Sequence, residues 1–338
     1  MKALNTPIPH SLSRLLATGS ALLCMVTGFV ASAAPPTPGS PIAIPNSHGG
    51  FDFIEVDQQN SRLLAPHTRN GTLDVFDSTS GKLIKQCWLG ATQSLAVDAQ
   101  SGKYYIAGSD KPRLVTIDSK TLESAGETTL SGPADIVTFD PKNHVAYVCH
   151  DDGTEVWAVD VVSNKVIASI SIPEGPEGIV YDEKGDRIFV NVRKTNEVVV
   201  IDPDANKVVA KWSTAPAQAP HGLAIDSGMH RLFAAGGNGQ LVEIDSGSGK
   251  VVSSAKIAPK VDQVAYDPEL KQIYSASGTG VISVVLAKNS GLESIGDVPT
   301  HSGAHSVAVD LKTHIVWTAY SDGNASYILP LKPAEPGQ

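Results

Sequence analysis

Seven short apolar runs, each ending in aspartate, recur along the chain at nearly constant spacing. The aspartates that end these runs are Asp57, Asp98, Asp140, Asp182, Asp226, Asp267 and Asp310. The gaps between them are 41, 42, 42, 44, 41 and 43 residues. Self-similarity at such a period is typical of architectures in which each repeat is one supersecondary unit. This spacing constrains the fold more than any other feature of the chain.

Each repeat has the pattern of four β-strands. In the fourth repeat, GIVYD is followed by a turn (EKGD), a second run (RIFVNV), a third run that ends in aspartate (EVVVID), and a fourth run (KVVAKW). Short β-branched and apolar runs between turn-forming residues are typical of strands, and no segment has the pattern of a long amphipathic helix. Four strands per repeat, seven times over, predict an all-β, seven-bladed β-propeller.

The last repeat lacks a fourth strand of its own. Only KPAEPGQ (332–338) follows its third strand, and two prolines make this tail a poor strand. The segment SPIAIPN (40–46) precedes the first repeat and belongs to none of the seven. We therefore expect an N-terminal strand to close the ring by completing the seventh blade, which places the propeller at residues 42–331.

The first 33 residues have the layout of a secretory signal peptide. Lys2 and Arg14 give a positive start, residues 15–30 are mostly apolar, and small residues at 31–33 provide a cleavage site after Ala33. This pattern predicts a periplasmic or secreted protein with an extended proline-rich leader at 34–41. No later run approaches the roughly 20 apolar residues of a membrane helix, so we do not expect the chain to insert into a membrane after cleavage. We also expect the mature protein to be a monomer.

The charge of the chain limits its partners. The formal net charge is −9, and loss of the two positive charges of the signal peptide takes it to −11. Nucleic-acid binding requires a positive surface, so no nucleic-acid partner is expected, whereas metal cations and basic partners are compatible. The two cysteines of the mature chain, Cys87 and Cys149, fall in different blades and are expected to be free buried thiols.

The repeats resemble a known family. Blade four, PEGIVYDEKGDRIFVNVRKTNEVVVIDPDANKVV, is similar to the YVTN-repeat (YncE-like) propellers, in which a Pro-x-Gly-type start leads into a strand that ends in Asp. A Tyr-Val-x-Asn-like strand and a Val-x-Val-Ile-Asp strand follow in that family. The resemblance covers nearly the whole of residues 42–331 and implies the propeller fold and export. Related propellers include lactonases, a streptogramin lyase and quinoprotein subunits, so the resemblance implies no single activity.

The repeat register places one set of polar residues around the central channel. The residue five positions before each repeat aspartate starts the innermost strand, on one face of the disc. All seven residues at this position are polar: Asp52, Gln93, Asp135, Glu177, His221, Asp262 and His305. Because blade seven closes on blade one, blades five, six, seven and one contribute His, Asp, His and Asp in unbroken order.

Other histidines fall on the same face by the same register. His67 and His150 end the second strands of blades one and three, and His48 and His301 precede the innermost strands of blades one and seven. A third group recurs in the first turn of its blade, on the opposite face, without an accompanying ring of carboxylates: His144, His230 and His314. Recurrence of a histidine is therefore not by itself a sign of function.

The channel ring has the ligand types of a divalent-metal site. Two imidazoles and a carboxylate form a facial set for iron, manganese or zinc, and we expect His221, Asp262 and His305 to hold such an ion with Asp52 beside them. Added imidazoles from His48, His67 and His301 would favour copper or zinc, and calcium is a further candidate. The alternative is a polar ring wetted by channel water, with Gln93, Asp135, Glu177 and His150 as further lining.

Three functions are compatible with this ring. The first is an exported protein that binds a small molecule, a metal ion or a protein partner at this face. The second is a metal-dependent enzyme of the lactonase or lyase type, with His305 or His221 as the catalytic acid or base. The third is a copper-handling or redox accessory protein. Basic residues of the same face, Arg193 among them, are expected to balance loop carboxylates such as Asp152 rather than to bind an anionic substrate.

Overall fold

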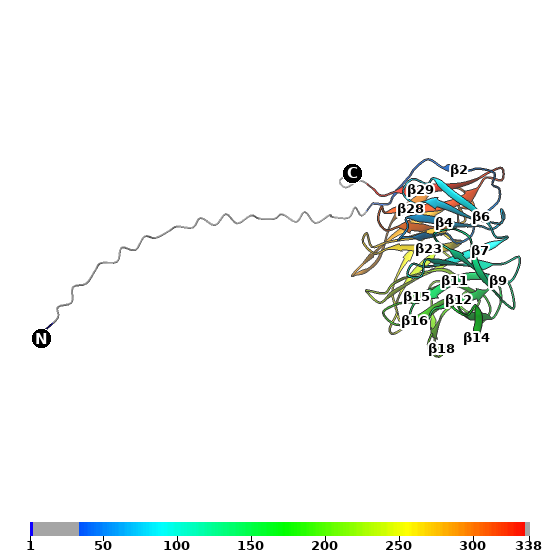
Figure 1. Cartoon of the computed structure of the whole chain (residues 1–338). Helices are drawn as coiled ribbons and strands as arrows, with labels where there is room; N and C mark the ends of the chain where they lie inside the picture. The colour runs from blue at the N-terminus through cyan, green and yellow to red at the C-terminus, as the bar shows by residue number, and fades with distance from the viewer. Residues whose placement is uncertain (3–33, 335–338) are drawn as a thin grey trace. The chain divides into compact units, whose positions relative to one another are not determined.

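The described part of the chain consists of β-strands. The computed structural model describes residues 1–2 and 34–334, and within them it contains 29 strands and no helix (Figure 1). The predicted signal peptide, residues 1–33, lies outside the described residues except for its first two. A search of the described residues found no helix that is long and apolar enough to cross a membrane.

Seven sheets of the predicted kind follow one another along the chain, which confirms the seven-bladed β-propeller. The strands of blades one to three are β3 (Glu55–Asp57), β4 (Arg62–His67), β5 (Thr72–Asp77), β6 (Leu83–Trp88), β7 (Thr92–Asp98), β8 (Lys103–Gly108), β9 (Arg113–Asp118), β10 (Ser124–Thr129), β11 (Ala134–Asp140), β12 (Val145–His150), β13 (Glu155–Asp160) and β14 (Lys165–Ser171).

The remaining blades have the same order of strands. Those of blades four to six are β15 (Pro176–Asp182), β16 (Arg187–Val192), β17 (Glu197–Asp202), β18 (Lys207–Ser213), β19 (Pro220–Asp226), β20 (Arg231–Gly236), β21 (Gln240–Asp245), β22 (Val251–Lys256), β23 (Val261–Asp267), β24 (Gln272–Ser277), β25 (Val281–Lys288) and β26 (Gly291–Pro299). Blade seven contains β27 (Ala308–Asp310), β28 (Ile315–Ser321) and β29 (Ser326–Lys332), together with the N-terminal β1 (Thr37–Pro38) and β2 (Ile42–Ile44).

The repeat aspartates recur because each one builds the turn that follows its strand. The carboxylate of Asp140 accepts hydrogen bonds from the backbone N–H groups of Lys142 and Asn143, at 2.9 and 3.2 Å. Asp267 makes the same pair of contacts in blade six. A side chain that bonds to the backbone two or three residues ahead stabilises a tight turn. The aspartates are thus an architectural feature of every blade.

The ring closes through the N-terminal strand, as the leftover segment predicts. Ile42 and Ile44 pair with Ile328 and Ser326 of β29, so the start of the described chain forms the outer strand of blade seven (Figure 1). Thr37 and Pro38 of β1 pair with Lys332 and Leu331, at the end of β29. Pro38 of the leader therefore occupies the edge of a sheet, where a missing N–H group costs least.

The hydrophobic core lies between neighbouring blades. One cluster joins Tyr105 of blade two to Trp157 of blade three, and another joins Trp317 of blade seven to Phe76 of blade one. Two of the four tryptophans are fully buried in this way, but Trp88 on the outer strand β6 is 74% exposed. Trp88 lies outside the core because the outermost strand of a blade has only one covered face.

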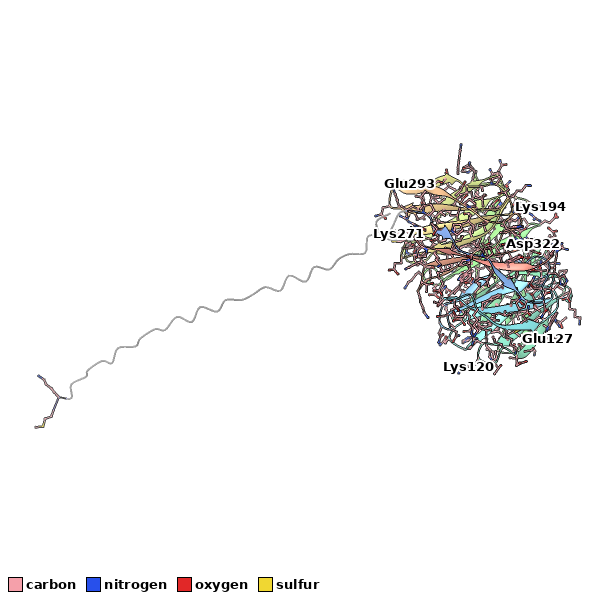
Figure 2. The ribbon with its side chains drawn as sticks, turned by 90° about the horizontal axis from the view of Figure 1, so that it is seen from above. Lys120, Glu127, Lys194, Lys271, Glu293 and Asp322 are labelled. Atoms are coloured by element: carbon pink, nitrogen blue, oxygen red, sulfur yellow. The ribbon has the colours of Figure 1, made fainter. Side chains whose placement is uncertain are left out.

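Charged side chains occupy the outer strands. Glu127 of β10 and Glu293 of β26 are exposed and lie at the edge of the domain (Figure 2). Cys87 and Cys149 are free and buried, as expected. The innermost strands of neighbouring blades contact one another around the ring, so the residues at their starts surround a common space.

Candidate functional site

A β-bulge positions the ring residue in five of the seven blades. Gln93, Asp135, Glu177, His221 and Asp262 are each the second residue of an innermost strand, and in each case the pairing with the next strand shifts immediately afterwards. A bulge leaves residues unpaired and redirects their side chains. In blades one and seven the strand begins later, so Asp52 and His305 precede β3 and β27.

Side chains of neighbouring blades hold these bulged segments in place. The buried Asn191 of β16 donates its amide hydrogens to the carbonyl oxygens of His221 and Gly222, at 2.8 and 3.0 Å. Gln263, the residue after Asp262, bonds to the backbone of Ile54 in blade one at 2.8 Å. The backbone at the channel is therefore fixed across blade boundaries.

The structure brings six of the seven ring residues to one cavity. Its volume is about 210 Å³, and its ring residues are Asp52, Gln93, Asp135, Glu177, His221 and Asp262. Asp151, Asp152 and Arg193 from loops on the same face complete the polar lining. At about 30 Å³ per water molecule, the cavity has room for several waters or a small ligand. We call it the channel mouth.

Burial and mutual repulsion make the carboxylates of the channel mouth weak acids. Burial, and next the charge of Asp135, raise the pKa of Asp52 well above its ordinary value. Burial and the charge of Glu177 do the same for Asp135. Burial raises the pKa of Glu177 from 4.5 to about 8, against the opposing effect of Arg193. These carboxyl groups therefore retain protons, or require a cation, near neutral pH.

Arg193 is the one basic side chain among the residues that line the channel mouth. Its guanidinium lies 2.9 Å from Glu177 Oε1 and also pairs with Asp152. The sequence-based expectation that this arginine balances loop carboxylates is met for Asp152. The contact with the ring residue Glu177 was not foreseen, because the register does not show how far a loop side chain reaches.

His221 has one ring nitrogen engaged. Its Nδ1 lies 2.9 Å from the carbonyl oxygen of Ala219, which requires a hydrogen on Nδ1. Its Nε2 lies 3.9 Å from Glu177 Oε1, beyond hydrogen-bonding distance. A histidine whose Nδ1 donates to a carbonyl presents Nε2 as an acceptor. The Nε2 of His221 is therefore available to a ligand at the channel mouth.

His305 is held more tightly. Its Nδ1 lies 2.7 Å from Asp262 Oδ2. Burial alone lowers the pKa of His305, but Asp262, Asp52 and the carbonyl of Phe51 together raise it above its ordinary value. The carboxylates around His305 thus stabilise the protonated form of its ring.

His67 is part of the interior rather than of the cavity. It is fully buried, stacks on Phe51 with ring centroids 3.9 Å apart, and places Nδ1 2.9 Å from Asp74 Oδ2. Its Nε2 lies 3.0 Å from the carbonyl of Gly49. Both nitrogens are occupied, so His67 shapes the loop between β4 and β5.

The other predicted histidines also lie apart from the channel mouth. His48 is exposed. His150 packs on Trp157 with centroids 4.7 Å apart. His301 stacks on Tyr320 with centroids 4.4 Å apart. Among the described residues, no group of three or more His, Cys, Asp or Glu side chains has a geometry that could hold a metal ion.

Glu55 is a channel residue that the sequence reasoning missed. It lies deeper in the channel, beside a cavity of about 110 Å³ that shares Phe53 and Ile136 with the channel mouth. Its side chain is exposed to the channel space, but the protein around it raises its pKa from 4.5 to about 7 by desolvation. The same repeat position holds only uncharged residues elsewhere: Ala96, Thr138, Val180, Ala224, Ala265 and Ala308. That contrast is the signal that could have identified it.

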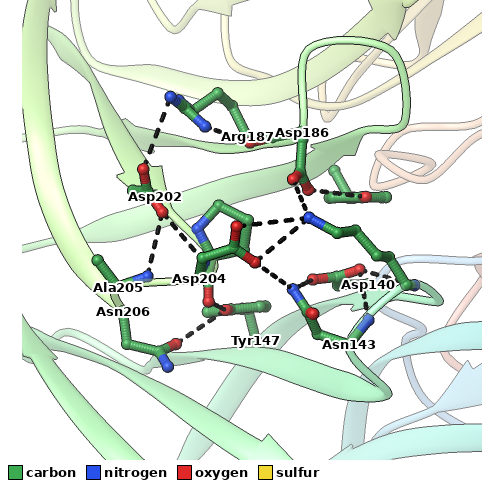
Figure 3. A network of polar contacts seen from close by, with 12 residues as sticks. Asp140, Asn143, Tyr147, Asp186, Arg187, Asp202, Asp204, Ala205 and Asn206 are labelled. Atoms are coloured by element: carbon green, nitrogen blue, oxygen red, sulfur yellow. Dashed lines mark hydrogen bonds and ion pairs between the residues drawn. The ribbon is translucent and has the colours of Figure 1, made fainter.

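The opposite face also carries polar side chains, but they pair with one another. Asn143 bonds to Asp140 at 2.9 Å and to Asp204 at 3.2 Å (Figure 3). Lys142 forms ion pairs with both Asp204 and Asp186. The three recurrent histidines of this face all have left-handed backbone, with φ of 55° at His144 and His230 and 57° at His314. Histidine is enriched in that conformation, so their recurrence has a structural cause.

Comparison with known proteins supports the resemblance drawn from the repeats. No family model matches the chain. The YncE protein of Salmonella typhi is 25% identical over 248 residues, which cover 71% of this chain and 68% of that protein. The YncE protein of Escherichia coli K12 is 25% identical over 247 residues, with the same coverage.

Solved structures share the fold at low sequence identity. A chain of the mitotic checkpoint complex has a TM-score of 0.75 at 15% identity, covering 97% of this chain and 100% of its own. A chain of Kuenenia stuttgartiensis hydrazine synthase has a TM-score of 0.71 at 14% identity, covering 86% of this chain and 99% of its own. Identities this low show the architecture alone. The chain is thus a seven-bladed β-propeller whose sequence is similar to that of the YncE proteins.

Proposed function

We propose that this protein is an exported binding protein that takes a cationic ligand at the channel mouth. The observation that carries the proposal is the gathering of six carboxylates, Asp52, Asp135, Asp151, Asp152, Glu177 and Asp262, around a cavity with a single arginine. Arg193 is already paired with Asp152 and Glu177, and His305 lies 2.7 Å from Asp262. This leaves Asp52, Asp135 and Asp151 without a compensating charge in the cavity lining. A bound cation would supply it.

Hydrogen-bonding capacity supports the same ligand class. The carboxylates are acceptors when ionised, Gln93 has a buried side-chain oxygen without a partner, and His221 presents Nε2 as an acceptor. A cavity rich in acceptors suits a ligand that is rich in donors, such as an ammonium group. The ligand would then compensate both the charge and the unmet hydrogen bonds of the channel mouth.

The spacing of the ring favours a cation that is larger than a bare metal ion. The four carboxylates of the ring come from four different blades, and no three ligand side chains in the described part of the chain converge on one point. A protonated amine, or a metal ion with its water shell, can bridge carboxylates that a bare ion cannot reach together. This arrangement supports cation binding more directly than a lactonase, lyase or copper-handling role, each of which requires a metal ion held directly by several side chains.

Titration calorimetry tests the proposal. Alkylamines and hydrated magnesium or calcium are titrated into the mature protein and into Asp135→Asn. We expect an amine to bind, with affinity lowered about tenfold or more in Asp135→Asn, since a charge-assisted hydrogen bond is lost. The matched control is Asp204→Asn on the opposite face, which should bind like the wild type.

The pH dependence gives a second readout of the same site. A cation competes with the protons that Asp52, Asp135 and Glu177 retain, so binding should strengthen as the pH rises toward 8 and should release protons. Proton release is measured by repeating the titration in buffers of different ionisation enthalpy. Equal affinity in Asp135→Asn and wild type, or the failure of every cation to bind, would contradict the proposal.

Export is the other part of the proposal. The layout of residues 1–33 supports it, and the experiment is expression of the full chain followed by fractionation and N-terminal sequencing. Recovery outside the cytoplasm with Ala34 as the first residue is expected. An intact N-terminus on cytoplasmic protein would contradict it.

A further inference from the structure

A second pocket opens beside the channel mouth, over blades five to seven. It has a volume of about 490 Å³ and is lined by Ala219, His221, Gly237, Lys260, Val261, Asp262, Gly278 and His305. His221 and Asp262 line this pocket and the channel mouth alike. The two spaces therefore meet at these side chains. We call the second space the side pocket.

The side pocket differs in chemistry from the channel mouth. Half of its lining residues are small or apolar: Ala219, Gly237, Val261 and Gly278. Neither glycine has the left-handed backbone that excludes a side chain, and a Cβ at Gly278 would meet nothing closer than the Lys260 carbonyl oxygen at 3.9 Å. The backbone does not require glycine at position 278, and the missing side chain leaves the pocket open. Such a lining suits an uncharged chain of a ligand.

Lys260 gives the side pocket a positive charge. It is exposed, and no ion pair of its ammonium group occurs among the residues that the structure describes. The nearby His305 is already neutralised by Asp262 at 2.7 Å. A second positive group on a ligand in this pocket would be repelled, whereas a carboxylate would be attracted.

We propose that the ligand is a zwitterion with well-separated charges, whose ammonium group binds at the channel mouth and whose uncharged chain and carboxylate lie in the side pocket toward Lys260. This inference rests on the proposed cation binding and adds the rest of the ligand to it. The carboxylates of the channel mouth match the ammonium group of such a molecule. The uncharged residues of the side pocket match its chain, and Lys260 matches its carboxylate. An ω-amino acid, or a peptide-like compound with a terminal amine, has this form.

Three ligands with the same six-carbon chain test the inference by titration calorimetry: aminohexanoate, hexylamine and diaminohexane. We expect aminohexanoate to bind about fivefold more tightly than hexylamine, the factor that one exposed ion pair typically gives, and diaminohexane to bind most weakly. Lys260→Met should remove the difference between aminohexanoate and hexylamine. Lys260→Glu should reverse the order, so that diaminohexane binds best.

Filling the side pocket with a larger side chain provides an independent test. Gly278→Leu should weaken all three six-carbon ligands while leaving methylamine unaffected, because methylamine occupies only the channel mouth. Gly247→Leu, in a turn outside both cavities, is the matched control, and the midpoint of urea unfolding confirms that each variant folds.

The outcomes separate this inference from the proposed function. If amines bind and Asp135→Asn weakens them, but the Lys260 and Gly278 variants leave the order of the three ligands unchanged, the zwitterion inference is wrong and cation binding stands. If no amine binds to the wild type, the zwitterion inference is wrong, and if magnesium and calcium also fail to bind, the proposed cation binding is wrong as well.

Discussion

Two histidines on one face of the propeller, His67 and His48, have opposite surroundings. His67 is fully buried between Asp74 and the Gly49 carbonyl, while His48 is exposed. The repeat register assigns both to the same face, since it fixes the position of each Cα. It does not reveal that Asp74, seven residues further on, contacts Nδ1 of His67 and that the Gly49 carbonyl contacts Nε2.

Replacing these histidines should have very different effects on stability. His67→Ala leaves the Asp74 carboxylate buried without its imidazole partner, so we expect the free energy of unfolding to fall by about 3 kcal/mol. His48→Ala should change it by less than about 0.5 kcal/mol. Urea denaturation followed by circular dichroism measures both. Similar losses of unfolding free energy in the two variants would mean that the buried contacts of His67 do not stabilise the fold.

The ionisation of Glu177 should appear in the pH dependence of stability. Its pKa is 4.5 in the unfolded chain and about 8 in the folded protein, so the folded protein retains a proton over this interval. Stability linked to a raised pKa is present at low pH and is lost as the pH rises through the folded value. The Glu177→Gln variant has no carboxyl group at this position to ionise, so it does not lose this stability as the pH rises.

The free energy of unfolding of Glu177→Gln, relative to that of the wild type, should therefore increase as the pH is raised from about 5 to about 9. Denaturation curves at several pH values measure the difference. Any fixed cost of removing the partner of Arg193 adds a constant and leaves the slope intact. A difference that stays constant with pH would show that Glu177 ionises normally.

At the level of strands, the sequence predicts most of what the structure shows. The repeat period locates all seven innermost strands, and the unassigned segment at 40–46 predicts the closure by β2. The bulges after Gln93, Asp135, Glu177, His221 and Asp262 were not predicted, because a bulge depends on the pairing between strands rather than on local composition. The pairing of Thr37–Pro38 with β29 within the expected leader was missed for the same reason.

The closing strand offers a direct test at this scale. Ile44 is 3% exposed and packs in the cluster that joins blades seven and one. Ile44→Ala should lower the free energy of unfolding by about 2–4 kcal/mol through the cavity that it leaves. Ala43, the exposed neighbour on the same strand, provides the control Ala43→Ser, which should change little. Equal midpoints of denaturation for the two variants would argue that β2 does not hold the ring closed.

The whole molecule is a closed ring in which each hydrophobic cluster belongs to two blades. Clusters that contain Trp157 and Trp317 join blades two to three and seven to one. A blade that unfolds removes part of the core of both neighbours, so opening at any point destabilises the rest. An open array of repeats, in contrast, can lose its terminal units one at a time.

We therefore expect the propeller to unfold in a single transition. Variants that keep only Trp157 or only Trp317, with the other tryptophans replaced by phenylalanine, report on opposite parts of the ring. Their fluorescence midpoints in urea should coincide with the midpoint from circular dichroism of the same variant. Separate fluorescence and circular dichroism midpoints within one variant would show that blades unfold independently.

The pairing of β2 with β29 also sets the order in which the protein can be completed during its synthesis. The two strands are neighbours in the same sheet, although six blades lie between them in the sequence. A nascent chain can assemble its middle blades, but it cannot finish blade seven until β29 has left the ribosome. Ring formation thus waits for β29, and a chain made only up to blade six keeps an open edge.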